Sequence, residues 1–154
     1  MYTVLIVLHS WLRWVVLLAG LMAVARAAAG RSSGRAWGPR DAGGGRLYTV
    51  LFDVQFLIGL LLYLFASPII AMARQYVGES MADPATRYWF VEHPAGMIVA
   101  LALAHVGRVR VRKATTDRSR FSRALVFYGL SVLIMVVTTP WPGTPYGREL
   151  FRFG

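Results

Sequence analysis

Cysteine is absent from this chain of 154 residues, which excludes disulfides, thiolate-bound zinc and cysteine-held iron–sulfur clusters. Charged residues are scarce, at 16%, where an average soluble domain carries about 25%. Acidic residues are the rarer charge, with 7 Asp and Glu against 17 Lys and Arg. Apolar residues make up 56% of the chain, and its mean hydropathy is +0.51. This composition predicts a membrane protein rather than a soluble domain.

Four apolar runs are each close to the ~20 residues that a helix needs to cross a hydrocarbon core of ~30 Å. They cover about residues 2–25, 48–70, 88–107 and 124–140. Strands of a membrane barrel would alternate apolar and polar residues, which these runs do not, so helices must satisfy the backbone. We therefore expect an all-α protein, a four-helix transmembrane bundle that forms a single membrane domain over residues 1–154.

Most of the cations lie between the first and second apolar runs or between the third and fourth. The positive-inside rule places both segments in the cytoplasm, and both termini on the outer, periplasmic side. We expect a flexible basic cytoplasmic loop over residues 27–46, which are rich in Gly, Ala, Ser and Arg, and an interfacial C-terminal tail over 141–154. The net charge of +10 thus reflects topology and attraction to membrane lipids, and we expect no nucleic-acid partner.

Two of the three histidines lie at similar depth in different apolar runs. His9 in the first run and His93 in the third are both on the order of 10 Å below the outer surface, at 1.5 Å per residue. Two imidazoles facing each other across a helical bundle can hold a haem iron from both sides. His9 and His93 are therefore the predicted metal ligands, although purely structural histidines or another functional use stay open.

Residues close to this pair are expected to contact the cofactor. Gly59 and Gly96 give room for a flat ring or a close helix, and Met97 is a further cofactor-binding candidate. Arg13 lies one turn from His9, and an unpaired guanidinium at this depth is costly, so it must have a partner. A haem propionate or the carboxylate of an acidic side chain would fit an Arg fork.

The acidic candidates for Arg13 are Glu92 and Asp53, and with Gln55 and His105 they outline a polar line across the bundle. Such a line is compatible with proton movement, with quinone binding, or with a structural network that fixes helix register. His105 is too far along the helix from His93 to share its metal. We expect His105 to be an interfacial or hydrogen-bonded residue rather than a ligand.

Four segments of the chain, in this order, carry a resemblance to a known family: LHSWLRWVVLL, DVQFLIGLLLY, VEHPAGMIVALAL and the closing TTPWP. On these segments the chain resembles the small four-helix bacterial membrane proteins named cytochrome B or cytochrome b-like. The resemblance implies a multi-pass protein of the bacterial plasma (inner) membrane with a b-type haem at His9 and His93. The chain is more distantly similar to cytochrome b561 and copper-resistance D-like membrane cytochromes, which carry two histidine pairs, whereas this chain offers one complete pair.

The function that we expect is electron transfer by one haem b, with no catalytic residues and no enzyme activity of its own. The partner would be a quinone, another redox protein or a larger membrane complex. The alternative is a haem-free accessory subunit of a respiratory or photosynthetic complex, binding lipid or pigment. A proton-coupled transporter is a weaker hypothesis, because the chain has no internal repeat.

Overall fold

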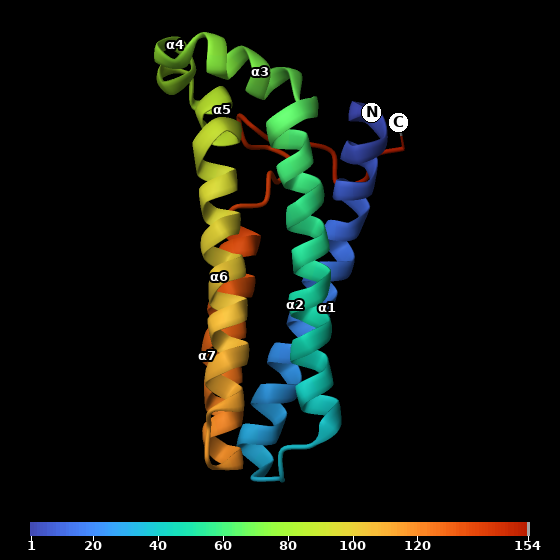
Figure 1. The fold of residues 1–154 in the computed structure, drawn as a ribbon, viewed down its shortest axis with the longest axis vertical. Coiled ribbons are helices and arrows are strands. Elements are labelled where there is room, and N and C mark those ends of the chain that lie inside the picture. The colour runs from blue at the N-terminus through green and yellow to red at the C-terminus, as the bar shows by residue number, and fades with distance from the viewer. Residues whose placement is uncertain (154) are drawn as a thin grey trace.

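Four long segments of helix lie side by side in the computed structural model, which describes residues 1–153 (Figure 1). The helices are α1 (Tyr2–Ser33), α2 (Pro39–Leu61) continued by the π-helical segment η1 (Leu62–Ala66), α3 (Pro68–Gln75), α4 (Val77–Ala82), α5 (Pro84–Arg87), the π-helical segment η2 (Tyr88–Glu92), α6 (His93–Arg112) and α7 (Asp117–Val137). The four long segments are α1, α2 with η1, α5 to α6, and α7, and each is long and apolar enough to cross a membrane. The predicted all-α class and the presence of four helices long and apolar enough to cross a membrane are confirmed.

The outward faces of these helices carry large apolar side chains. Leu18 of α1, Leu57 of α2, Ile98 of α6 and Leu133 of α7 are each more than half exposed. Such a surface would be costly in water and is what a helix presents to lipid. The exposed faces therefore agree with the length and hydropathy of the helices.

The interior is held together by the close approach of helices at small residues and by one chain of hydrogen bonds. α1 packs along α2 and α7, and α6 packs along α7. A side chain at Gly20 of α1 would lie 2.7 Å from Val132 and 2.8 Å from Tyr48, so only glycine allows this approach. The buried Tyr48 hydroxyl pairs with Ser131 at 2.7 Å, and Ser131 donates to the Ala100 carbonyl at 2.6 Å. This chain links α2, α7 and α6 without leaving a polar group unpaired.

The predicted flexible loop 27–46 is wrong, because most of it is helical. α1 runs to Ser33 and α2 begins at Pro39. The alanines after Arg26 have high helix propensity, and Gly34 ends the helix with a left-handed φ of 67°. Arg35 then grips Asp41 through two hydrogen bonds of 2.7 Å, which fixes the turn. α6 similarly continues to Arg112, beyond the predicted end at 107.

Both termini and the short helices α3, α4 and α5 lie at the end of the molecule opposite the turn at residues 34–38 (Figure 1). We call this the terminal end, and the end that holds residues 34–38 and 113–116 the basic end. The second long segment stops at Ala66, short of the predicted 70, because Ser67 caps α3 and Pro68 opens it. The tail after α7 forms no helix and crosses the terminal end to reach α1, as the red trace in Figure 1 shows.

Candidate functional site

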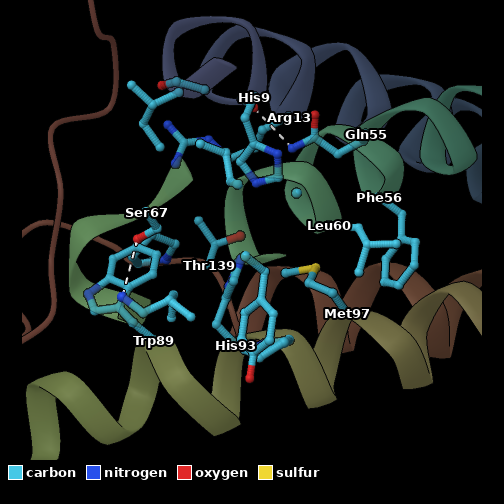
Figure 2. Close-up of a pocket in the computed structure, with 18 of the residues that line it drawn as sticks. His9, Arg13, Gln55, Phe56, Leu60, Ser67, Trp89, His93, Met97 and Thr139 are labelled. Carbon is cyan, nitrogen blue, oxygen red and sulfur yellow. Dashed lines mark hydrogen bonds between the residues drawn. The ribbon is translucent and has the colours of Figure 1, made fainter. Parts of the chain in front are cut away.

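His9 and His93 lie on opposite sides of a cavity at the terminal end (Figure 2). Their ring centroids are 6.4 Å apart, and the ring planes are inclined at 76°. Two imidazoles on opposite sides of one metal ion, each with a metal–nitrogen bond of about 2.0–2.1 Å and about 1.1 Å from nitrogen to ring centroid, would have centroids about 6.3 Å apart. The separation of the two rings therefore suits a metal held between them.

The metal would have to bring further ligands of its own. Within residues 1–153, no group of three or more His, Cys, Asp or Glu side chains is placed to hold a metal ion. A bare ion such as zinc needs about four protein or water ligands, so a two-histidine site is poor for it. A macrocycle such as haem already carries its equatorial nitrogens and needs only the two axial ones.

His93 is held in one orientation by the end of α7. Its Nδ1 lies 2.9 Å from the backbone carbonyl oxygen of Thr138, which also accepts a hydrogen bond of 2.6 Å from the Tyr88 hydroxyl. A carbonyl can only accept, so Nδ1 carries the hydrogen and Nε2 keeps its lone pair. Metal-ligating histidines are oriented in the same way by a carbonyl on the far nitrogen.

The irregular backbone before His93 explains why this residue faces inward. Pro94 follows it and has no N–H, so the carbonyl of Phe90 loses its ordinary helical partner. The Tyr63 hydroxyl donates to that carbonyl at 3.1 Å. The helix adopts a π-helical turn, η2, directly before His93, an irregularity that often occurs at functional sites.

His9 is positioned by α2. The Gln55 amide donates to the His9 carbonyl at 2.9 Å, and a side chain at Gly59 would lie 2.9 Å from Cε1 of the His9 ring. Gly59 therefore leaves the space that the His9 ring occupies.

The cavity has a volume of about 520 Å³, within the range of about 300–1,000 Å³ that is usual for ligand sites. Of the predicted site residues, His9, Arg13, Gly59, His93 and Met97 line it. Figure 2 shows Phe56, Leu60 and Met97 on one side of the histidine pair, and the backbone of the C-terminal tail on the other side. The cavity is thus apolar on one side and bordered by the polar tail on the other.

Buried polar atoms without a hydrogen-bond partner gather around this cavity. In the described part of the chain there are five such atoms, and four belong to residues that line it: His9 Nδ1, Arg13 Nε, Gln55 Oε1 and Trp89 Nε1. Buried polar groups are nearly always paired, and an exception calls for a ligand, water or ion. Their clustering marks the cavity as a site for a ligand that carries polar groups.

Neither of the acidic side chains expected to pair with Arg13 does so, and the expected polar line is not found, whereas a haem propionate as a partner of Arg13 stays a prediction. Arg13 pairs with neither Glu92 nor Asp53, and instead donates to the Leu150 carbonyl of the tail at 2.6 Å. Glu92 pairs with Arg87 at 2.8 Å. A continuous polar line from Glu92 to the basic end does not form, because Glu92 pairs with Arg87 and Arg13 pairs with the tail, while Asp53 and His105 pair only with each other.

Gly96, predicted to contact the cofactor, does not line the cavity between His9 and His93. A side chain there would run into Thr138, so this glycine lets α6 approach the end of α7. Its contribution to the site is indirect, since Thr138 supplies the carbonyl that orients His93.

His105 and Asp53 form a separate pair between α6 and α2. The His105 Nε2 lies 2.7 Å from the Asp53 carboxylate, and the two side chains are 45% and 42% exposed. His105 is therefore hydrogen-bonded, as expected, and does not line the histidine cavity.

Several residues of the site were not predicted from the sequence. Tyr88 and the Thr138 carbonyl orient His93, and Arg148 and Arg152 of the tail line the cavity. Only the TTPWP segment gave a signal, since its prolines mark the place where α7 must stop and its last carbonyls become free to accept.

Comparisons with protein-family models, with curated proteins and with solved structures find no match to this chain. The resemblance to the cytochrome b-like family therefore stays a prediction, and the site has to be interpreted from its own geometry.

Proposed function

We propose that this protein is a membrane cytochrome that binds one haem b between His9 and His93 and passes electrons to or from a partner. The observation that carries the proposal is the 6.4 Å separation of the two rings, together with the hydrogen bond that leaves Nε2 of His93 as its coordinating atom. When bound, the haem would supply one-electron chemistry at the iron. Because His9 and His93 would both hold the haem, no position would stay open for a substrate, and electron transfer is favoured over substrate chemistry.

The residues of the chain would hold and shield this group. His9 and His93 would ligate the iron, Gly59 gives the His9 ring its space, and Met97 supports the apolar side of the cavity. The apolar lining would keep water away from the ligand, which affects its reduction potential.

The proposed topology is a four-helix bundle of the bacterial plasma membrane, with the basic end in the cytoplasm. The arginines near the two turns of the basic end, residues 34–38 and 113–116, support this orientation through the positive-inside rule. The haem would then lie near the outer face, and the electron partner would be a quinone in the membrane or a redox protein on that side.

The test is a reduced-minus-oxidised absorption spectrum of the purified protein in detergent. We expect sharp low-spin α and Soret bands in the wild type, and their loss or conversion to high-spin bands in His9→Ala and in His93→Ala. His105→Ala is the matched control and should keep the wild-type bands, since His105 pairs with Asp53 away from the cavity. A protein that stays colourless when supplied with haem would refute the proposal, and chlorin bands would replace it with a pigment-binding subunit.

A further inference from the structure

Three arginines border the histidine cavity where the C-terminal tail crosses it. Arg13 comes from α1, and Arg148 and Arg152 from the tail. Glu149 is the single acidic side chain that lines the cavity in the described part of the chain. The tail side of the cavity is therefore strongly cationic, although the rest of the lining is mainly apolar.

These guanidinium groups have unused hydrogen-bonding capacity. Arg13 donates through one terminal nitrogen to the Leu150 carbonyl, but its buried Nε has no partner. The Arg148 guanidinium lies 5.2 Å from the ring centre of Trp89. Within residues 1–153, the side chains of Arg148 and Arg152 make no hydrogen bond or ion pair. A guanidinium has five N–H donors, so each of the three groups can donate further hydrogen bonds to an anionic partner.

The tail that carries two of these arginines is fixed in place by its backbone. Trp11 of α1 donates to the Arg152 carbonyl at 2.8 Å, and Trp14 donates to the Leu150 carbonyl at 3.0 Å. Phe151 stacks on Trp14 with ring centres 5.6 Å apart. Because main-chain groups and an aromatic side chain hold the tail, the arginine side chains stay free to bind a ligand.

We infer that Arg13, Arg148 and Arg152 form a carboxylate-binding rim, which receives the acidic substituents of a flat apolar ligand lying between the histidines. This inference rests on the proposed function, in which the ligand is haem b and the acidic groups are its two propionates. A carboxylate brought to an apolar cavity is stabilised by charge-assisted, two-pronged hydrogen bonds from arginine. The tail would thus be part of the binding site rather than a surface segment.

The experiment compares a metal-free porphyrin diacid, mesoporphyrin, with its dimethyl ester, using quenching of tryptophan fluorescence in the detergent-purified protein. Trp89 lines the cavity and provides the signal. We expect the wild type to bind the diacid about tenfold or more tightly than the ester. The double variant Arg148→Gln/Arg152→Gln should lose most of this preference, and the Arg148→Lys/Arg152→Lys variant should recover part of it.

Arg112→Gln/Arg118→Gln is the charge-matched control, because both arginines are exposed at the basic end, and it should keep the wild-type preference. Three results would each refute the carboxylate-binding role of these arginines. They are equal affinity for diacid and ester in the wild type, no binding of either compound, and an unchanged preference in the double glutamine variant. The proposed function fails separately, if the iron-containing porphyrin binds without low-spin bands. Because the diacid preference needs no iron, the two failures are distinguishable.

Discussion

Gly59 of α2 is the position where the smallest substitution tests the histidine geometry. An alanine Cβ there would lie 2.9 Å from Cε1 and 3.5 Å from Nδ1 of the His9 ring. Ordinary van der Waals contact begins near 3.4 Å, so the ring or the helix would have to shift by about 0.5 Å in a closely packed interior. His9 is the group free to move, because the Gln55 amide anchors its backbone and not its ring.

The expected cost in haem affinity follows from the position of the His9 ring. Overpacking of an interior costs about 1–3 kcal/mol, and it falls on the haem-bound protein, in which the ring could not turn away. The gain in helix propensity from glycine to alanine, about 0.5–1 kcal/mol, is present with and without haem and cancels in the affinity. We therefore expect Gly59→Ala to lower haem affinity by about tenfold, which corresponds to about 1.4 kcal/mol, with part of the bound haem in the high-spin form. Titration of haem into the haem-free protein, followed at the Soret band, measures both quantities.

Gly129→Ala provides the control, because a Cβ at Gly129 in α7 meets nothing within 4 Å. This variant gains the same helix propensity without touching His9, so it should raise thermal stability slightly and leave the spectrum unchanged. Wild-type affinity and spectrum in Gly59→Ala would refute ligation of the haem by the His9 ring in this position.

Three further predictions concern the groups around the site and in the core. Ser131→Ala should destabilise the protein by about 1–3 kcal/mol in thermal unfolding, because it leaves the buried Tyr48 hydroxyl unpaired, and it should not alter the haem spectrum. Tyr88→Phe should cost about 0.5–1.5 kcal/mol of stability and change the midpoint potential, since it removes a competitor for the carbonyl that orients His93. Hydrogen bonds from the Thr86 hydroxyl and backbone N–H hold the pKa of Asp83 below its usual range. The capping of α5 by Asp83 is therefore present at neutral pH, and it is lost as the pH falls below the usual Asp value of about 4 and through the lowered pKa. The protection factors of the α5 amides, which correct for the intrinsic pH dependence of hydrogen exchange, should then fall in acid in the wild type, and should be low and independent of this titration in Asp83→Ala.

The membrane-crossing helices were predictable because length and hydropathy are set by the bilayer alone. Each apolar run had to satisfy its own backbone hydrogen bonds, and this requirement selects a helix without reference to tertiary contacts. Helix ends depend on other forces. Residues 27–33 are helical because of alanine propensity and a glycine stop, neither of which hydropathy measures.

The histidine pair was predictable for a similar reason, since depth along a straight helix follows from residue counting. Orientation around the helix did not follow from counting. The π-helical turn before His93 changes the direction in which that side chain points. Pro94 removes the ordinary helical partner of the Phe90 carbonyl, but the Tyr63 hydroxyl that pairs with this carbonyl comes from another helix. A contact between residues 27 positions apart, with a main-chain atom as acceptor, leaves no mark in the pattern of side chains.

The partner of Arg13 shows the same limit from the opposite direction. Among the protein's own groups, we expected the carboxylate of Glu92 or Asp53, because a charged donor is most strongly stabilised by an acidic side chain. The acceptor is the carbonyl of Leu150, 137 positions away, and Trp14 donates to the same atom. An irregular tail has carbonyls that no helix satisfies, and irregular backbone at membrane depth is tolerated only where protein groups pair with it. The polar side chains of α1 and the helix-free tail therefore explain each other: the tail supplies acceptors to Arg13 and Trp14, and these donors allow the tail to lie over the cavity.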